Sequence, residues 1–277
     1  MGSYLNPGNF SFKGSLRSKI YVDKSKLIAK TNEALCTEQK YICLSRPRRF
    51  GKSMAANMLA AYYDRSENTE ELFQNLAISK DDSYKENLNQ YDVIKINMQE
   101  FLSMAGTMEE MLTMLKNYLV SDFEETYPKV RFRDEKNLIQ VMKDVFSYTK
   151  CPFVILIDEW DCLFREYKQD KEAQKKYLDF LRVWLKDKDY VAMAYMTGIL
   201  PIKKYGSHSA LNMFTEYSMT DPGDFAEYFG FTEQEVLELC EKYGMSFEES
   251  KIWYDGYQLV VHQKEKDECY SMYSPKS

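Results

Sequence analysis

The sequence has few of the residues that build metal centres and disulfide frameworks. Its 277 residues include two histidines, His208 and His262, and six cysteines without a Cys-x-x-Cys pair. Zinc sites and small disulfide-rich domains both need such residues at close, regular spacings. Several of the cysteines stand in apolar runs, which is typical of core residues in a reduced protein. Neither a zinc site nor a disulfide framework is indicated.

Long apolar runs and an excess of positive charge are also missing. No N-terminal stretch has signal-peptide length and nothing later approaches a membrane span, so we expect a cytoplasmic protein with no membrane partner. The net charge of −6 argues against a protein that coats nucleic acid with its whole surface, although a local basic patch could still bind it. The length allows one large α/β domain or two small ones.

One glycine is missing from the stretch with the clearest motif. Residues 41–54 read YICLSRPRRFGKSM, and the P-loop (Walker A) pattern of Gly, four residues and Gly-Lys-[Ser/Thr] would place a glycine where Arg46 stands. Gly51, Lys52 and Ser53 match the other half. In that half the glycine admits backbone N–H groups to an anion, the lysine reaches the β- and γ-phosphates, and the serine ligates Mg²⁺. A basic surface turn is the alternative.

The local context favours the phosphate loop. Residues 41–44 form a short apolar run typical of a buried strand, and residues 53–63 are rich in helix formers. A phosphate held between them would lie at a helix N-terminus, where the helix dipole favours negative charge. The predicted nucleotide-binding residues are Arg46, Pro47, Arg48, Arg49, Phe50, Gly51, Lys52, Ser53 and Met54.

A second apolar run ends in two carboxylates. Residues 153–157 are all apolar, as a central parallel strand requires, and Asp158 and Glu159 follow directly, as in a Walker B motif. Such carboxylates point into the crevice where α/β sheets bind ligands. We expect Asp158 to hold Mg²⁺ together with Ser53, and Glu159 to polarise the water that attacks the γ-phosphate. An acidic pair that merely opens the next helix is the alternative.

The rest of the chain predicts a mostly parallel sheet flanked by helices. Thr197, at the end of a further strand, is a catalytic candidate that could bond the γ-phosphate or the water, or could instead cap its own turn. Asp23 is a plausible N-cap for a helix that carries Leu27 and Ile28. The other expected segments are strands at 91–97, 190–196 and 214–219, a polar helical connector at 64–89, and helices at 108–126, 135–148 and 177–186.

The C-terminal part changes in character. Thr232 and Glu235 form a capping box, with Phe231 and Val236 placed as its hydrophobic staple, and Gly244 ends the helix. We expect a P-loop core with its N-terminal segment at 1–222 and a partial helical lid subdomain at 223–277.

These residues resemble a known family, the bacterial AAA-ATPase-like proteins. The resemblance rests on YVDK at 21–24, SRPRRFGKS at 45–53, LIDEWD at 156–161, TGI at 197–199, EYFGFT at 227–232 and WYDGY at 253–257. In that family an arginine at position 46 is the usual form of the loop. Trp160 departs from the expected tyrosine and leaves both carboxylates in place.

The resemblance implies an additional-strand P-loop fold. It also implies that Gly51, Lys52, Ser53 and Asp158 bind ATP and Mg²⁺ and that Glu159 serves hydrolysis. The family's ATPase domain is commonly followed by a PD-(D/E)XK nuclease-like domain, which is absent from these residues, so we interpret the chain as truncated before it and assign it no nuclease function.

The leading hypothesis is a Mg²⁺-dependent ATPase whose nucleotide cycle moves a lid or an attached effector, slowly in the isolated chain if a partner supplies the arginine finger. Arg48, Arg49, Arg182 or a neighbouring subunit of a homo-oligomer could supply that finger. The alternatives are a nucleotide-gated interaction module without hydrolysis, and a nucleic-acid-binding protein that uses the basic loop at 46–49.

Overall fold

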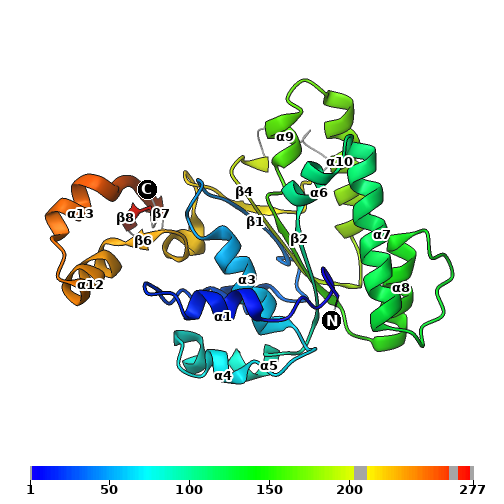
Figure 1. The fold of residues 1–277 in the computed structure, drawn as a ribbon, viewed down its shortest axis with the longest axis horizontal. Helices are drawn as coiled ribbons and strands as arrows, with labels where there is room; N and C mark the ends of the chain where they lie inside the picture. Colours follow the sequence, from blue (N-terminus) through cyan, green and yellow to red (C-terminus); the bar gives the residue numbers. More distant parts are fainter. Residues whose placement is uncertain (1, 203–210, 262–267, 275–277) are drawn as a thin grey trace.

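The computed structural model describes residues 2–202, 211–261 and 268–274; His208, His262 and residues 275–277 lie outside them. A five-stranded parallel sheet crosses the larger part of the molecule with helices on both faces (Figure 1). Its strands are β1 (Tyr41–Ser45), β2 (Asp92–Asn97), β3 (Phe153–Asp158), β4 (Val191–Gly198) and β5 (Thr215–Tyr217).

The strand order is β2-β3-β4-β1-β5. Strand β4 is inserted between β1 and β3, pairing Leu44 with Thr197 on one side and Ile157 with Met196 on the other. Since all five strands run the same way, the carboxyl ends of β1, β3 and β4 meet at one edge of the sheet. This is the additional-strand arrangement expected from the resemblance, and it brings the two motif stretches together.

The strands bury side chains on both faces, which gives the protein two core layers. Tyr41, Cys43 and Ile155 face one layer, which is filled by α6 (Met98–Met104), α7 (Met108–Thr126), α8 (Leu138–Thr149) and α10 (Lys171–Leu185). Ile42 and Leu44 face the other, which is filled by α1 (Phe10–Leu16), α2 (Leu27–Ala34) and α3 (Lys52–Tyr63). Because successive side chains point to opposite faces and both faces are covered, the central strands β1, β3 and β4 are apolar over most of their length.

The expected helices are present with shifted bounds. The helix predicted at 108–126 is α7, with the same bounds. The helix predicted from residue 135 is α8, which begins at Leu138, and the helix predicted from residue 177 is α10, which begins earlier, at Lys171. Asp170 caps α10 by accepting a hydrogen bond of 2.9 Å from the Ala173 amide. The connector at 64–89 holds α4 (Glu70–Phe73), the 3₁₀ helix η1 (Ala77–Lys80) and α5 (Tyr84–Asn87).

The prediction that Asp23 caps a helix is wrong. Helix α2 begins three residues later than that cap would require, at Leu27, and Asp23 instead accepts bonds from the Ser25 amide at 2.8 Å and the Ala77 amide at 2.6 Å. A distant amide therefore competes successfully for this carboxylate. Leu27 and Ile28 are buried, as expected.

Residues 223–261 and 268–274 form a C-terminal module beside the core (Figure 1). It contains the 3₁₀ helix η2 (Gly223–Tyr228), β6 (Phe231–Thr232), α12 (Glu233–Tyr243), α13 (Phe247–Tyr254), β7 (Asp255–Val261) and β8 (Glu268–Tyr273). The capping box of Thr232 and Glu235 is present and Gly244 ends α12. The capping box predicted α12, whereas α13 and the small antiparallel sheet β6-β8-β7 were not predicted.

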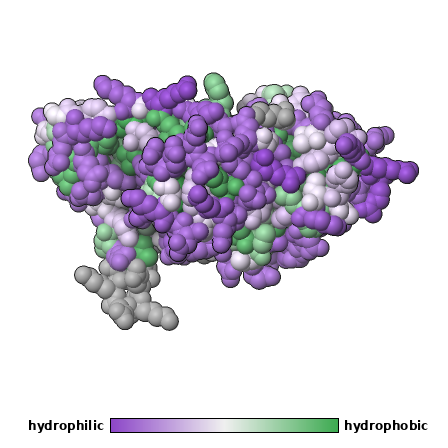
Figure 2. Space-filling model, turned by 90° about the horizontal axis from the view of Figure 1, so that it is seen from below, coloured by the Kyte–Doolittle hydropathy of each residue, from purple (hydrophilic) through white to green (hydrophobic). Residues whose placement is uncertain are grey.

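The surface is largely hydrophilic. Figure 2 shows polar residues over most of one face, with hydrophobic residues gathered toward the end that holds the C-terminal module. Among the described residues no helix combines the length and apolar character needed to cross a membrane.

Candidate functional site

In the loop between β1 and α3, Gly51 leaves the backbone N–H groups accessible to a ligand. Gly51 adopts φ 84°, in the left-handed region where residues with a side chain are strained, and α3 begins at Lys52. The N–H groups in the first turn of a helix have no carbonyl partner within the helix. The loop therefore directs unpaired helix donors and a dipole toward the space in front of it.

Lys52 lies over this loop. Its side chain is buried, and Nζ donates to the carbonyl of Arg46 at 3.0 Å and to that of Pro47 at 2.9 Å. Burial lowers the pKa of Lys52, while the negative charges of Glu159 and Asp158 act in the opposite direction. The nearby carboxylates thus help to keep a cation in a desolvated position.

Asp158 connects the ends of three elements. Its Oδ2 accepts a hydrogen bond of 2.5 Å from Ser53 at the start of α3, and its Oδ1 accepts one from Thr197 at the end of β4. The Glu159 amide donates to the same Oδ1 at 3.0 Å. The hydroxyl of Thr197 is therefore directed at Asp158 in the structure rather than at its own turn. Candidate residues from three separate stretches of the sequence therefore lie in one bonded cluster.

Glu159 stands at the turn after β3 in an uncommon conformation. Its φ of 54° is left-handed, which costs about 1 to 3 kcal/mol for a residue other than glycine and is often found at functional sites. Burial raises the pKa of its carboxyl group, and the positive charge of Arg165 opposes that rise. The side chains of Glu159 and Arg165 form an ion pair.

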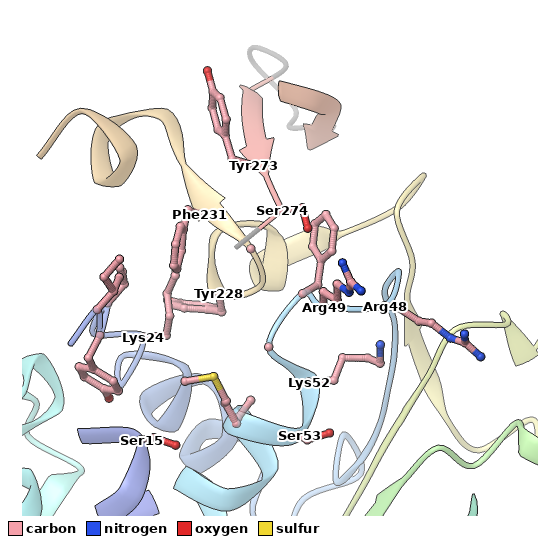
Figure 3. Close-up of a pocket in the computed structure, with 18 of the residues that line it drawn as sticks. Ser15, Lys24, Arg48, Arg49, Lys52, Ser53, Tyr228, Phe231, Tyr273 and Ser274 are labelled. Carbon is pink, nitrogen blue, oxygen red and sulfur yellow. The ribbon is translucent and has the colours of Figure 1, made fainter. Parts of the chain in front are cut away.

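A cavity of about 1140 Å³ opens in front of the loop. Figure 3 shows Lys52 and Ser53 at its base, Arg48 and Arg49 beside them, and Tyr228 and other residues of the C-terminal module facing them. The loop contributes residues 48–54 to the lining, and the end of β3 contributes Glu159. Residues 20–22 and Lys24 come from the N-terminal segment, and Val236, Leu239 and Cys240 come from the C-terminal module. Asp158 and Thr197 are outside the lining and are joined to it through Ser53.

Arg46 is placed differently from the other loop arginines. Its side chain is fully buried and donates to the carbonyls of Tyr217 at 2.7 Å and Phe225 at 3.4 Å, with the guanidinium 5.5 Å from the Phe229 ring centre. Burial lowers its pKa to about 10. The guanidinium of Arg46 thus connects the loop to β5 and η2, which leaves Arg48 and Arg49 as the exposed arginines of the loop.

Two residues near Glu159 carried no predicted role. Arg165, in α9 (Cys162–Glu166), pairs with Glu159, and the buried Asp161 accepts bonds from the Ile199 and Leu200 amides at 3.1 and 2.8 Å. The spacing of Asp161 and Arg165, four residues apart at a helix start, was the available signal. Arg182, considered above as an arginine finger, pairs with Asp179 on α10 and is not part of the cavity lining.

The donor set fits a magnesium ion bound together with phosphate. Mg²⁺ prefers hard oxygen ligands and is usually held by one or two protein groups plus phosphates and water. Ser53 and Asp158 supply a hydroxyl and a carboxylate in direct contact. Within the described ranges no cluster of three or more His, Cys, Asp or Glu side chains could hold a metal by itself.

The parallel sheet with β4 inserted, together with the loop at the start of α3, defines a P-loop protein of the additional-strand type. The chain belongs to the family described as Predicted AAA-ATPase, whose model matches residues 11–207.

One curated relative is an uncharacterised protein in the vnfD 5′ region of Azotobacter chroococcum mcd 1, which is 25% identical over 248 residues. The match covers 86% of this chain and 45% of the relative, so the chain spans less than half of that relative's length. Among solved structures, the Orc1 protein of Aeropyrum pernix in complex with DNA matches with 12% identity and a TM-score of 0.42, covering 88% of this chain and 55% of its own.

Proposed function

We propose that the chain binds ATP with Mg²⁺, hydrolyses it, and changes the position of its C-terminal module with the state of the nucleotide. The observation that carries this proposal is the direct bonding of Asp158 to Ser53 and Thr197. Those contacts join the loop, the end of β3 and the end of β4 around one carboxylate. If the loop were only a surface turn and Asp158 and Glu159 only opened the next helix, no contact between Ser53 and Asp158 would be expected.

Each residue has a role that its position supports. Lys52 and the α3 N-terminus would hold the β- and γ-phosphates, since both offer donors beside the cavity. Glu159 lines the same cavity and would polarise the attacking water. Thr197, which lies outside the lining, would act on the site by orienting Asp158 through its hydrogen bond. Ser53 and Asp158 would hold Mg²⁺, which when bound would supply positive charge against the negative charge that develops during transfer. Phosphoryl transfer depends mainly on such positioning and charge.

The apolar part of the cavity would receive the base. Val22, Met58, Val236 and Leu239 line it, and they come from the N-terminal segment, α3 and α12. Small-molecule sites are commonly apolar with a few placed polar groups. A nucleotide with its phosphates on the loop would therefore contact both the core and the C-terminal module.

Direct contacts between the loop and the module support coupling to conformational change. The carbonyl of Phe50 accepts a bond from the Gly230 amide at 3.1 Å, and the Phe50 ring packs on Tyr257 with ring centres 5.1 Å apart. Arg46 adds its bond to the Phe225 carbonyl in η2. A shift of the loop would therefore move the residues of the module that contact it, and a nucleotide-driven lid requires such coupling.

The proposal extends to partners only through the family resemblance. The effector moved by the lid would be a nuclease-like domain such as commonly follows this domain. The arginine finger would come from Arg48 or Arg49, which line the cavity, or from a neighbouring subunit of a homo-oligomer. A nucleic-acid role for the loop at 46–49 has less support, because the Arg46 guanidinium is buried and bonded to main-chain carbonyls. An interaction module without hydrolysis would show tight ATP binding and no turnover.

Phosphate release separates these possibilities. We expect slow turnover by the wild type, a loss of at least about tenfold in Lys52→Ala and in Glu159→Gln, and retained ATP binding in Glu159→Gln. Lys85→Ala is the matched control, because that lysine is 80% exposed. Equal rates in the wild type, Lys52→Ala and Glu159→Gln would contradict hydrolysis at this site.

A further inference from the structure

Glu159 is held by an arginine from its own chain. The guanidinium Nη2 of Arg165 pairs with Oε2 of Glu159, and the two side chains are 17% and 22% exposed. Both residues line the cavity that also contains Lys52. A pair this shielded from solvent loses less of its attraction to screening than an exposed pair does.

Arg165 is itself held by two further side chains, Gln99 of α6 and Asp161 at the start of its own helix. Its Nη2 donates to Oε1 of Gln99 in α6 at 3.3 Å, and its Nε lies 3.4 Å from Oδ2 of Asp161. Asp161 in turn accepts the Ile199 and Leu200 amides that follow β4. The guanidinium is thus positioned by groups from three directions, and a planar fork suits such multiple contacts better than a lysine ammonium does.

Glu159 needs an external support of this kind. Its left-handed backbone persists only where surrounding contacts over-determine it. The amide of Glu159 is bonded to Asp158, which fixes the main chain but leaves the side chain free to rotate. The contact with Arg165 engages one carboxylate oxygen, Oε2, and so restrains the direction of the whole group.

We propose that Arg165 is the positioning residue for Glu159: it holds the carboxylate toward the cavity so that Oε1 can meet the attacking water. This inference rests on the proposed ATPase function. Arg165 acts through Glu159, so its loss reduces the rate of the chemical step and leaves nucleotide binding intact. A misplacement of about 1 Å can cost about 10²-fold in rate.

The test compares Arg165→Gln and Arg165→Lys with the wild type by kcat, KM for ATP and the Kd of a fluorescent ATP analogue. Arg165→Gln is expected to lower kcat about 10- to 100-fold with KM and Kd unchanged within about twofold. Arg165→Lys restores part of the rate, because an ammonium can pair with Glu159 but cannot reproduce the fork. Arg131→Gln is the matched control, since that arginine is exposed and lies outside the cavity lining.

A double-mutant cycle shows whether Arg165 acts through Glu159. In a Glu159→Gln background, Arg165→Gln should add less than about threefold to the loss, since the group it positions is already gone. An unchanged kcat in Arg165→Gln overturns the proposal. The proposal is also overturned if the fold decrease in kcat of the double variant equals the product of the two single decreases, or if Arg165→Gln raises the Kd for ATP. Either result would indicate that Arg165 contacts the phosphate instead.

Melting temperatures of the same four proteins without nucleotide provide a readout independent of turnover. The loss in the double variant should be smaller than the sum of the two single losses, because the singles each break the same pair. Strictly additive losses contradict the pairing. A wild type that neither binds nor hydrolyses ATP would instead refute the proposed function, while this cycle still decides whether Arg165 supports Glu159.

Discussion

At the scale of single residues, the packing beside Glu159 depends on Gly198, which has no side chain and so admits the ring of Trp160. A Cβ added to Gly198 would lie 2.7 Å from Trp160 Nε1 and 2.9 Å from Asp161 Oδ1. Trp160 is fully buried and packs against Phe164, with ring centres 5.6 Å apart. Trp160 is therefore a packing element, and the absence of a side chain at Gly198 makes room for it beside Glu159.

Gly198→Ala is expected to destabilise the protein by about 1 to 3 kcal/mol, because a well-packed interior must shift to admit the methyl group. Gly14→Ala is the control: nothing lies within 4 Å of its added Cβ, and it stands inside α1. It should stabilise by about 0.5 to 1 kcal/mol. Urea unfolding of both variants gives the comparison, and an equal effect of the two substitutions would contradict the close packing at Gly198.

The residues of the site differ in how far the sequence could predict them. Ser53 and Asp158 were predictable, since each belongs to a motif whose chemistry is local. Their contact confirms that the motifs meet, while their roles with nucleotide stay predictions. The partners of Arg46 could not be predicted, because Tyr217 and Phe225 lie about 170 residues further along the chain. Arg165 was missed because its role depends on the turn of the chain after β3.

At the scale of elements, the sheet was predictable and the C-terminal module less so. Strands β1 and β3 are apolar up to their last residues, Ser45 and Asp158, because both faces are covered, which gives a strong signal. Strand β6 has two residues, and it pairs with β8, where Phe231 meets Tyr273 across some forty residues. A strand this short carries no periodicity of its own.

Lys24 joins the N-terminal segment to the C-terminal module. Its Nζ donates to Glu235 at 2.6 Å and to the Glu227 carbonyl at 2.5 Å, and Glu235 also completes the capping box of α12. Burial lowers the pKa of Lys24, and the charge of Glu235 opposes that effect. The motif at 21–24 therefore has a structural role at the rim of the cavity.

Lys24→Met should cost about 2 kcal/mol of stability, because Glu235 loses a charged donor while the aliphatic stem is kept. ATP affinity should fall several-fold, since the module that closes the cavity is less firmly held. Lys30→Met is the control, as its pairs with Glu33 and Asp224 involve carboxylates that are 65% and 72% exposed. Thermal melts and nucleotide titrations measure both effects; similar losses in the two variants would argue against a specific contact at Lys24.

At the scale of the whole molecule, segments from distant parts of the chain line the same cavity. The P-loop, the carboxyl end of β3, the N-terminal segment and the C-terminal module all line it. The loop and the module also touch directly through Phe50 and Gly230. A ligand in this cavity would therefore hold the parts together and stabilise the folded chain.

A nucleotide titration followed by thermal unfolding, with and without Mg²⁺, tests the central claim most directly. A ligand that binds only the folded state stabilises it by about 2.7 kcal/mol at 100 times its Kd. We predict that ATP raises the melting temperature, that Mg²⁺ increases the rise, and that Ser53→Ala loses the magnesium-dependent part. No shift with any nucleotide, or an equal magnesium effect in Ser53→Ala, would contradict a magnesium-nucleotide site on Ser53 and Asp158.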